Sequence, residues 1–306
     1  MALEDRFILM KQDRQKVRAN FREALVCGMR GETSSLKCLP SFLPPPSGEE
    51  HGEWMALDFG GTNLRAMTVR LAGGKADILR MKKVSLRKAG AYDLTDGSTT
   101  AEELFDAIAH LVADVAPERG DVLLGHTFSF PARQISIDKA ELITWTKEFA
   151  VQGVVGREVN GLLADALARC GASRIRPAAI VNDTVGTLLC CAYREPSATI
   201  GSICGTGHNT AAVLPDGMLY NLESGNFDGI DMTEYDAEID RTSLIQGAQR
   251  LEKMCAGHYL GKLVTLAASE ELAMLRTGAQ LTGEDLSVIL ADGGESVRTA
   301  DLIEAR

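Results

Sequence analysis

Two stretches of the chain have the alternating pattern of a β-hairpin built around a glycine turn. Residues 55–59 read as one strand, Gly-Gly-Thr-Asn at 60–63 as the turn, and residues 64–71 as the returning strand. Residues 200–213 repeat this order, with Gly-Thr-Gly at 205–207. The repetition predicts two similar lobes, each presenting a glycine turn to a shared cleft. The alternative is that two unrelated hairpins share this pattern by coincidence.

The remaining hydrophobic pattern predicts helices alternating with buried strands. Within residues 3–27, the apolar residues Val17, Phe21 and Leu25 recur every four positions, which predicts an amphipathic helix stopped by Gly28 or Gly31. A proline-rich connector follows at 40–48. Further helices are predicted over 101–115 and 153–169, and buried strands over 122–124 and 178–181. This alternation is typical of an α/β fold.

The composition of the chain excludes some classes of binding partner but says little about the fold. A chain of 306 residues with 45% hydrophobic residues is long enough for roughly two domains. The net charge of -10 argues against nucleic acid and anionic membranes, although backbone N–H groups can still bind a phosphorylated ligand. The N-terminus lacks the apolar core of a signal peptide, and no stretch approaches the ~20 apolar residues of a spanning helix. We therefore expect a cytoplasmic protein.

The cysteines give no sign of a metal or redox centre. They are seven in number, scattered, and form no C-x-x-C pair that would indicate zinc or thioredoxin chemistry: Cys27, Cys38, Cys170, Cys190, Cys191, Cys204 and Cys255. We expect reduced thiols that behave as small hydrophobic side chains.

The first glycine turn has a chemistry suited to phosphate. Its two glycines let successive N–H groups approach one anion, and its polar residues add donors. Asp58 can hold Mg²⁺ through water, and Arg65 can neutralise phosphate charge. The motif is neither a Walker loop nor a dinucleotide-binding glycine motif. A plain hairpin turn with solvated charges is the alternative.

A second candidate lies directly after the strand predicted at 178–181. Asp183 could accept the proton of a sugar hydroxyl, which is a poor nucleophile at neutral pH. The structural alternative is that Asp183 caps the helix that follows, since aspartate is a good helix cap.

Taken together, the motifs resemble those of the eukaryotic-type hexokinases, including the vertebrate glucokinases. The resemblance runs from about Lys37 to about Leu263, with the motifs in the family's order. They are Leu57-Asp58-Phe59-Gly60-Gly61-Thr62-Asn63-Leu64-Arg65, Thr127-Phe128-Ser129-Phe130-Pro131, Ile143-Thr144-Trp145-Thr146-Lys147, Val181-Asn182-Asp183-Thr184-Val185-Gly186-Thr187, Gly205-Thr206-Gly207-His208-Asn209, and Leu251-Glu252-Lys253-Met254 followed by Gly257-His258-Tyr259-Leu260-Gly261.

The resemblance implies a hexokinase fold, which is an α/β fold of two actin-like or ribonuclease-H-like lobes around a cleft. We expect a small lobe over 51–182 and a large lobe over 183–306, with the helix and connector of 1–50 packed on the large lobe. The implied activity is transfer of a phosphoryl group from Mg-ATP to the 6-hydroxyl of a hexose, with glucose, mannose and fructose as candidate substrates.

The resemblance also implies roles for individual residues. The expected hexose contacts are Ser129, Thr146, Lys147, Asn182, Asp183, Asn209, Glu223 and Glu252, with Asp183 as catalytic base and Lys147 steadying charge near the transferred group. The expected phosphate and Mg-ATP contacts are Asp58, Gly60, Gly61, Thr62, Asn63, Arg65, Thr206 and Gly257, with Asp58 holding Mg²⁺ through water. Trp145 is expected to pack in the core.

The chain departs from the family pattern at several positions. Glu148 stands where a glycine usually follows the lysine, His208 and residues 210–212 replace the usual residues around Asn209, and residues 223–229 are one residue longer than usual. Beyond a short helix opened by Thr282 and another over 295–306, no adenosine-binding segment is recognisable. The unrecognised adenosine segment predicts a large lobe incomplete at its C-terminus and a chain that binds hexose better than nucleotide. The alternatives are a hexose-binding or regulatory protein of weak or absent activity, and another sugar or acid kinase.

Overall fold

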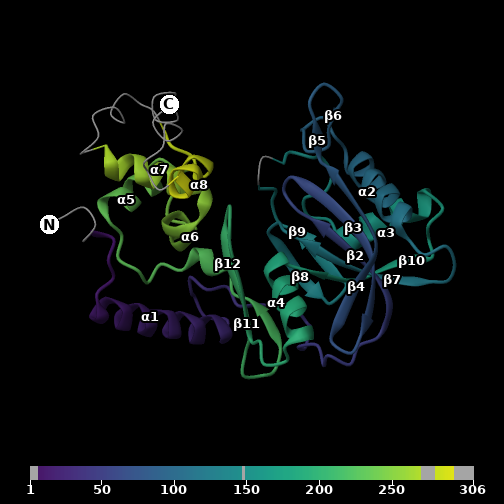
Figure 1. Cartoon of the computed structure of the whole chain (residues 1–306), viewed down its shortest axis with the longest axis horizontal. Helices are drawn as coiled ribbons and strands as arrows, with labels where there is room; N and C mark the ends of the chain where they lie inside the picture. The colour runs from purple at the N-terminus through teal and green to yellow at the C-terminus, as the bar shows by residue number, and fades with distance from the viewer. Residues whose placement is uncertain (1–5, 147–148, 270–279, 293–306) are drawn as a thin grey trace. The chain divides into compact units, whose positions relative to one another are not determined.

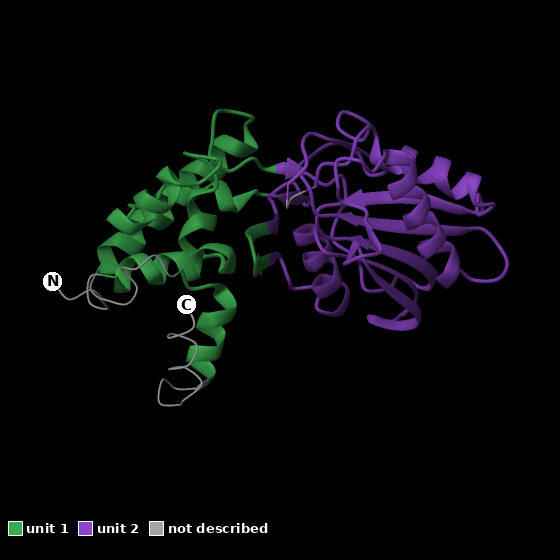
Figure 2. Ribbon diagram, turned by 90° about the horizontal axis from the view of Figure 1, so that it is seen from above, with its two compact units in different colours: residues 1–38, 202–210, 222–306 green, residues 39–201, 211–221 purple. Residues whose placement is uncertain are grey.

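The computed structural model describes residues 6–146, 149–269 and 280–292, which form two compact units (Figure 1; Figure 2). Unit 2 comprises residues 39–201 and 211–221, and unit 1 comprises residues 1–38, 202–210 and 222–306. Residues 183–201 and 211–221 thus pack with unit 2, although the sequence prediction assigned them to the large lobe. Packing does not test which halves act as functional lobes, so the predicted lobe limits stay a prediction.

Unit 2 is built on a five-stranded sheet in the order β10-β7-β2-β3-β4. Strands β2 (Gly52–Phe59), β3 (Asn63–Ala72) and β4 (Lys75–Ser85) form an antiparallel meander, whereas β7 (Val122–Phe128) and β10 (Ile175–Val181) run parallel to β2. Burial alternates residue by residue along β7 and along the second half of β2, because successive side chains point to opposite faces of the sheet. The predicted strands at 55–59, 64–71, 122–124 and 178–181 are therefore confirmed.

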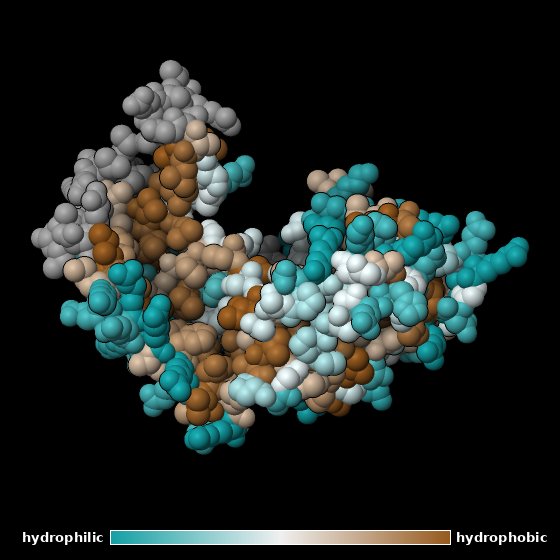
Figure 3. Space-filling model, turned by 60° about the horizontal axis from the view of Figure 1, so that its bottom comes forward, coloured by the Kyte–Doolittle hydropathy of each residue, from teal (hydrophilic) through white to brown (hydrophobic). Residues whose placement is uncertain are grey.

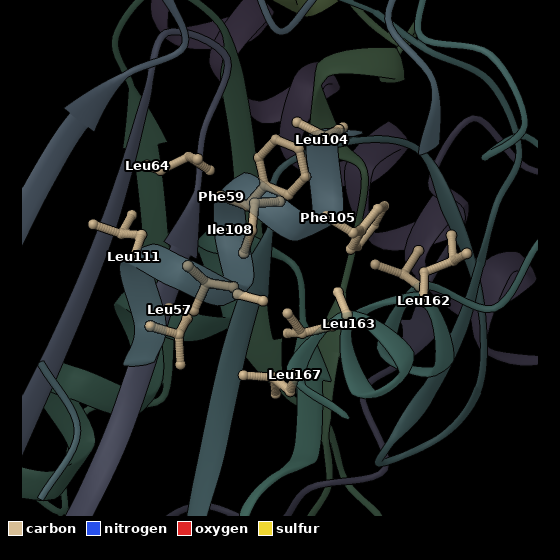
Figure 4. Packing of buried hydrophobic residues seen from close by; sticks show 14 of the residues in the cluster. Leu57, Phe59, Leu64, Leu104, Phe105, Ile108, Leu111, Leu162, Leu163 and Leu167 are labelled. Carbon is tan, nitrogen blue, oxygen red and sulfur yellow. The ribbon is translucent and has the colours of Figure 1, made fainter. Parts of the chain in front are cut away.

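Two helices supply the other half of the unit 2 core. Leucine and phenylalanine side chains of α2 (Ala101–Val115) and α3 (Val159–Arg169) pack against Leu57, Phe59 and Leu64 of the sheet (Figure 4). Helix α2 begins with a reciprocal cap, in which the Thr100 hydroxyl accepts from the Glu103 N–H and the Glu103 carboxylate accepts from the Thr100 N–H. This core fixes the strands whose ends carry the predicted site residues.

His126 on β7 is buried in this core and is held neutral. Its ring stacks on Phe59, its Nδ1–H donates to Asn160 Oδ1 at 3.1 Å, and its Nε2 is buried without a hydrogen-bond partner among the described residues. Asn160 Oδ1 can only accept, so Nδ1 carries the proton. Burial lowers the pKa of His126 to about 4.

This depressed pKa predicts acid sensitivity of the folded chain. Between pH 6.5 and pH 4 the unfolded state binds a proton that the folded state does not, so stability falls as the pH drops, by about 3 kcal/mol in total. Urea unfolding between pH 7.5 and pH 4.5 should show a steeper loss for the wild type than for His126→Leu. His110→Gln, which alters an exposed histidine of α2, should keep the wild-type slope, and equal slopes in all three proteins would refute the assignment.

Shorter elements complete unit 2. Two short hairpins come between the main strands in chain order: β5 (Arg87–Lys88) pairs with β6 (Tyr92–Asp93), and β8 (Ala132–Ser136) pairs with β9 (Lys139–Leu142). Helix α4 (Asp183–Arg194) follows β10. A second sheet has the order β1-β13-β12-β11 and contains β1 (Leu39–Pro40), β13 (Leu219–Asn221), β12 (His208–Val213) and β11 (Ile200–Cys204). The predicted second hairpin at 200–213 is thus confirmed, and its glycine turn belongs to unit 1.

Unit 1 is mostly helical. It contains α1 (Lys11–Met29), the 3-10 helix η2 (Ser224–Asn226), α5 (Glu234–Arg241), α6 (Arg250–Cys255), α7 (Gly257–Ala268) and α8 (Gly283–Asp292). Phe21 of α1 packs edge-on against Phe227 at 5.0 Å, and Asn20 Nδ2 donates to the Gly229 carbonyl at 2.8 Å. Residues 227–229 therefore form part of the surface on which α1 packs.

Two predicted helices begin later than expected. Helix α1 starts at Lys11 because the preceding residues make tertiary contacts instead, with Phe7 stacked on Tyr235 and Arg6 paired with Glu234. Helix α3 starts at Val159 rather than 153, because Gly153 and Gly156 both adopt φ of +77°, which is incompatible with a right-handed helix. The helix opened by Thr282 is confirmed as α8, whereas the one predicted over 295–306 lies outside the described residues.

Unit 1 carries large apolar side chains on its surface as well as in a buried cluster. Figure 3 shows hydrophobic residues gathered on the visible face of unit 1, at the left. Exposed large side chains of this unit include Leu244, Ile245 and Val264, and one buried cluster consists of Tyr235, Ile239, Leu263 and Ala267. None of the described helices is long and apolar enough to cross a bilayer.

Candidate active site

Two of the predicted magnesium and phosphate residues, Asp58 and Arg65, lie in one row across the unit 2 sheet. Asp58 on β2 stands between Arg65 on β3 and Thr127 on β7. Arg65 Nη1 donates to Asp58 Oδ2 at 2.6 Å, and Thr127 Oγ1 donates to Asp58 Oδ1 at 3.0 Å. The Asp58 side chain keeps 30% of its surface exposed. A partly exposed carboxylate held in place by two donors suits the outer-shell contact by which Mg²⁺ is often bound in proteins.

The first glycine turn is pinned at its two ends. The Gly60 N–H donates to the Asn63 carbonyl at 3.2 Å, and the Thr62 carbonyl accepts from the Leu86 N–H at 3.0 Å. Within the described residues, the N–H groups of Gly61 and Thr62 have no acceptor. The turn can therefore offer backbone donors to an anion, as the sequence predicts.

Three parallel strands end at the same edge of the unit 2 sheet, and predicted site residues follow each of them. The first glycine turn follows β2, Ser129 follows β7, and Asn182 and Asp183 follow β10. The Ser129 N–H donates to the Phe59 carbonyl at 3.3 Å, which ties two of these strand ends together. Ligands of open α/β sheets commonly bind beyond the carboxyl ends of the strands.

Asn182, and not Asp183, caps helix α4. The Asn182 side-chain oxygen accepts from the Thr184 N–H at 2.9 Å, and Asp183 is the first residue of the helix. The structural alternative, in which Asp183 serves as the cap, is therefore wrong. Gly186 allows this helix start to approach β7, since a Cβ there would lie 2.9 Å from Thr127 Cγ2. Asp183 is thus left available for chemistry at the sheet edge.

The motif at 143–147, which contains the predicted hexose contacts Thr146 and Lys147, is anchored by aromatic residues. Trp145 packs edge-on against Phe130 at 4.9 Å, stacks on Phe149, and donates from Nε1 to the Val151 carbonyl at 2.9 Å. The prediction that Trp145 packs in the core is confirmed. Thr146 is exposed, and its carbonyl accepts from the Phe149 N–H at 3.2 Å. Lys147 and Glu148 lie outside the described residues, so the role assigned to Lys147 stays a prediction.

In unit 1, helices α6 and α7 hold the second glycine turn. Glu252 Oε2 accepts from the His208 N–H at 2.8 Å, and the carbonyls of Gly205 and Thr206 accept from the N–H groups of Gly257 and His258 at 2.7 and 3.1 Å. The Thr206 side chain is exposed. The Gly257 N–H is already bonded, so Gly257 would serve a phosphate ligand by allowing close approach rather than by donating.

Three predicted hexose residues lie close together in unit 1. Asn209 Oδ1 accepts from the Ser224 N–H at 3.2 Å, which places Glu223 next to Asn209, while Glu252 is joined to the neighbouring His208. Glu223 adopts a left-handed conformation with φ of 52°. This conformation costs a non-glycine residue about 1–2 kcal/mol, and such strain often marks functional sites.

The polar groups supporting this cluster were not predicted from the sequence. The Ser224 hydroxyl donates to Thr210 Oγ1 at 2.9 Å and lies 3.3 Å from His208 Nε2. Next to Glu252, buried Lys253 donates from Nζ to Asp240 Oδ1 at 2.6 Å and to the Ile245 carbonyl at 2.7 Å. The Lys253 hydrogen bond lowers the pKa of the Asp240 carboxyl.

Thiols also gather beside the second turn. Cys204 Sγ lies 3.8 Å from the Cys255 carbonyl oxygen, although the two residues are 51 positions apart in the chain. Burial, and then the neighbouring Cys204, raise the pKa of the Cys255 thiol to about 11. Cys255 is therefore protonated at neutral pH and is no activated nucleophile.

Comparisons with known proteins agree on one family. Two family models, both described as hexokinase, match residues 1–193 and 199–304. Mouse (Mus musculus) hexokinase-3 is 37% identical over 281 residues, covering 84% of this chain and 30% of the relative, and human (Homo sapiens) hexokinase-1 is 38% identical over 283 residues, covering 84% and 30%. The chain thus spans about 30% of the length of these curated relatives.

Solved structures agree in fold. A crystal structure of a hexokinase is 33% identical, with a TM-score of 0.84 over 99% of this chain and 77% of that chain. A hexokinase from Schistosoma mansoni, solved in complex with glucose, is 33% identical with a TM-score of 0.71 over 87% of this chain and 64% of that chain. The predicted α/β hexokinase fold is confirmed.

Proposed function

The chain belongs to the hexokinase family, and on this premise we propose that it binds a hexose and transfers a phosphoryl group from Mg-ATP to the sugar's 6-hydroxyl. The observation that carries the proposal is the position of Asp183. Asp183 follows the carboxyl end of the parallel strand β10, and Asn182 rather than Asp183 caps the next helix. Strand β10 pairs with β7, whose residue Thr127 donates a hydrogen bond to Asp58. A carboxylate in such a place can accept the proton of an attacking hydroxyl.

The proposed hexose contacts are Ser129, Thr146, Lys147, Asn182, Asp183, Asn209, Glu223 and Glu252. Amides, hydroxyls and carboxylates can each pair with one sugar hydroxyl, and a site of this kind rejects analogues that leave a partner unpaired. The glucose complex of the Schistosoma relative supports glucose as the first sugar to test.

The proposed triphosphate contacts are the two glycine turns. Gly61, Thr62 and Asn63 would offer donors, Gly60 would allow close approach of the backbone, Thr206 and Gly257 would adjoin the phosphates, and Arg65 would balance phosphate charge. Mg²⁺, when held through water by Asp58, would neutralise charge on the phosphates. Asp183 would hold the proton that the sugar hydroxyl loses.

One pair of measurements tests the function. Glucose titration by calorimetry and glucose-dependent ATP consumption should both be positive for the chain. Glucose binding without turnover would favour the alternative of a hexose-binding or regulatory protein, and the absence of both would contradict the proposal.

Two conservative variants test the hexose contacts of each unit separately. Glu252→Gln keeps an acceptor for the His208 N–H, and Asn182→Ser keeps a helix cap, so both should fold normally. Losing a charged hydrogen bond should raise the glucose Kd of Glu252→Gln about 10- to 150-fold, and Asn182→Ser should also weaken binding. Calorimetry would measure both against Glu118→Gln, an exposed control. Unchanged Kd values would place the sugar elsewhere.

A further inference from the structure

Three side chains with metal-binding atoms meet at the second glycine turn of unit 1. The ligand atoms of Cys204, His208 and Cys255 all lie within 4.8 Å of one another. Cys204 ends β11, His208 begins β12 and Cys255 ends α6, so each ligand stands at the end of a regular element (Figure 1). Tetrahedral zinc with Zn–S bonds of about 2.3 Å separates two sulfurs by roughly 3.8 Å. The three ligand atoms would therefore need to move only slightly closer together to hold a zinc ion.

The surrounding hydrogen bonds hold this arrangement without any metal. The Gly257 N–H binds the Gly205 carbonyl at 2.7 Å, and Glu252 binds the His208 N–H at 2.8 Å. These two bonds join the corner between α6 and α7 to both sides of the turn. These two bonds use none of the side-chain atoms of the three ligands, which suits a preorganised site.

The hydrogen bonds around His208 favour the tautomer that leaves one ring nitrogen available to a ligand. The Ser224 hydroxyl donates its hydrogen to Thr210 Oγ1, so its oxygen can accept from His208 Nε2–H at 3.3 Å. Nδ1 then carries a lone pair, and it is buried with no hydrogen-bond partner among the described residues. Metal-bound histidines commonly donate their other N–H to such an outer partner, which fixes the tautomer. A buried lone pair without a donor is otherwise unfavourable.

The donor set selects the kind of ion. Two sulfurs and one imidazole nitrogen favour Zn²⁺ or Cu⁺ over Mg²⁺ and Ca²⁺, which prefer oxygen ligands. Cys204 is exposed to solvent, so water can complete a tetrahedron. We propose that Cys204 and Cys255, on releasing their thiol protons to solvent, bind one Zn²⁺ ion together with His208 and thereby connect the end of α6 to both ends of the second glycine turn. None of these three residues is among the proposed hexose or Mg-ATP contacts, so the zinc proposal does not depend on kinase activity.

Zinc binding to the reduced full chain tests the proposal directly. With a non-thiol reductant present, chelator competition should give one tightly bound Zn²⁺ per chain, and Co²⁺ should produce the thiolate-to-metal charge-transfer absorption of a sulfur-ligated site. Cys204→Ser, Cys255→Ser and His208→Ala should each lose more affinity than the roughly 10- to 100-fold typical of an outer-partner change. Ser224→Ala should fall within that range.

Matched controls separate this site from adventitious thiol binding. Cys190→Ser and Cys191→Ser alter exposed cysteines of unit 2 and should keep the wild-type zinc affinity. Circular dichroism spectra and Tm values of the metal-free variants would show that each is folded. A reduced chain that binds no zinc would overturn the proposal. Zinc affinity that survives both Cys204→Ser and His208→Ala would overturn it equally.

Discussion

Replacing Asp183 by asparagine is expected to lower kcat for hexose phosphorylation by about 10²–10⁴-fold, the usual effect of removing a general base. Asparagine has nearly the same shape but cannot take the proton of the sugar hydroxyl. The fold should be preserved, because Asn182 supplies the cap of α4 and the lost charge in the first helical turn contributes only about 0.3–1 kcal/mol. A coupled assay at saturating glucose and Mg-ATP measures kcat.

Asp165→Asn is the matched control for this change, since Asp165 is an exposed aspartate on the neighbouring helix α3 of the same unit. Its kcat and Tm should equal those of the wild type. A wild-type kcat in Asp183→Asn would exclude Asp183 as the base. A loss of activity accompanied by a large fall in Tm would mean that Asp183 has a structural role instead.

The strands and turns of the site could be predicted because their signals are local. Alternating burial along β2 and β7 reflects the two-residue period of a strand, which is visible in the sequence itself. The glycine turns at 60–61 and 205–207 likewise interrupt apolar stretches. Both hairpins were therefore found with nearly correct bounds.

The helix starts could not be predicted because tertiary contacts and backbone conformation decide them. Residues 7–10 have a helical composition, but the Phe7 ring stacks on Tyr235, more than 200 residues away in the chain. Gly153 and Gly156 look like tolerable interruptions of a helical pattern until their positive φ values are known. Neither effect leaves a periodic signal in the sequence.

The roles of residues at the sheet edge depend on hydrogen bonds that the sequence does not reveal. Asn182 and Asp183 are both good caps, so the sequence alone left Asp183 with two readings, and only the bond from the Thr184 N–H to Asn182 decides between them. The motif containing Gly257 indicated a phosphate contact but not that its N–H is occupied by the Gly205 carbonyl.

The thiol and imidazole cluster was missed because its spacing resembles no zinc motif. Cys204 and His208 are four residues apart, but Cys255 lies 51 positions from Cys204 and comes from a helix. The sequence contains no C-x-x-C pair, and ligands assembled by the packing of α6 against a hairpin leave no such local motif. The one local hint was His208, which departs from the family pattern.

Lys253 illustrates a motif residue whose role only the fold explains. In the sequence it adjoins the predicted hexose ligand Glu252 within the motif at 251–254, and no role was assigned to it. In the structure its side chain is 2% exposed, and its ammonium group is shared between Asp240 of α5 and the Ile245 carbonyl. The Gly247 N–H also donates to the Asp240 carboxylate. This ion pair positions α6, the helix that carries Glu252.

Lys253→Met is therefore expected to lower the free energy of unfolding by about 3–5 kcal/mol, which is the usual cost of leaving one member of a buried ion pair unpaired. Methionine keeps most of the apolar stem, so the loss reports the missing charge and hydrogen bonds rather than a cavity. Urea denaturation at pH 7 measures the change. Lys11→Met, at the exposed start of α1, should stay within about 0.5 kcal/mol of the wild type.

The double variant Lys253→Met/Asp240→Asn separates the charge effect from simple loss of packing. Asparagine at 240 keeps an acceptor for the Gly247 N–H and removes the uncompensated charge, so the double variant should regain a substantial part of the lost stability. If the two substitutions instead destabilise additively, the ion pair contributes no coupling, and α6 is held by its apolar contacts alone. Glucose affinity should follow the same order as stability, because Glu252 shares the helix with Lys253. An unfolding free energy of Lys253→Met equal to that of Lys11→Met would show that the buried ammonium group stabilises nothing.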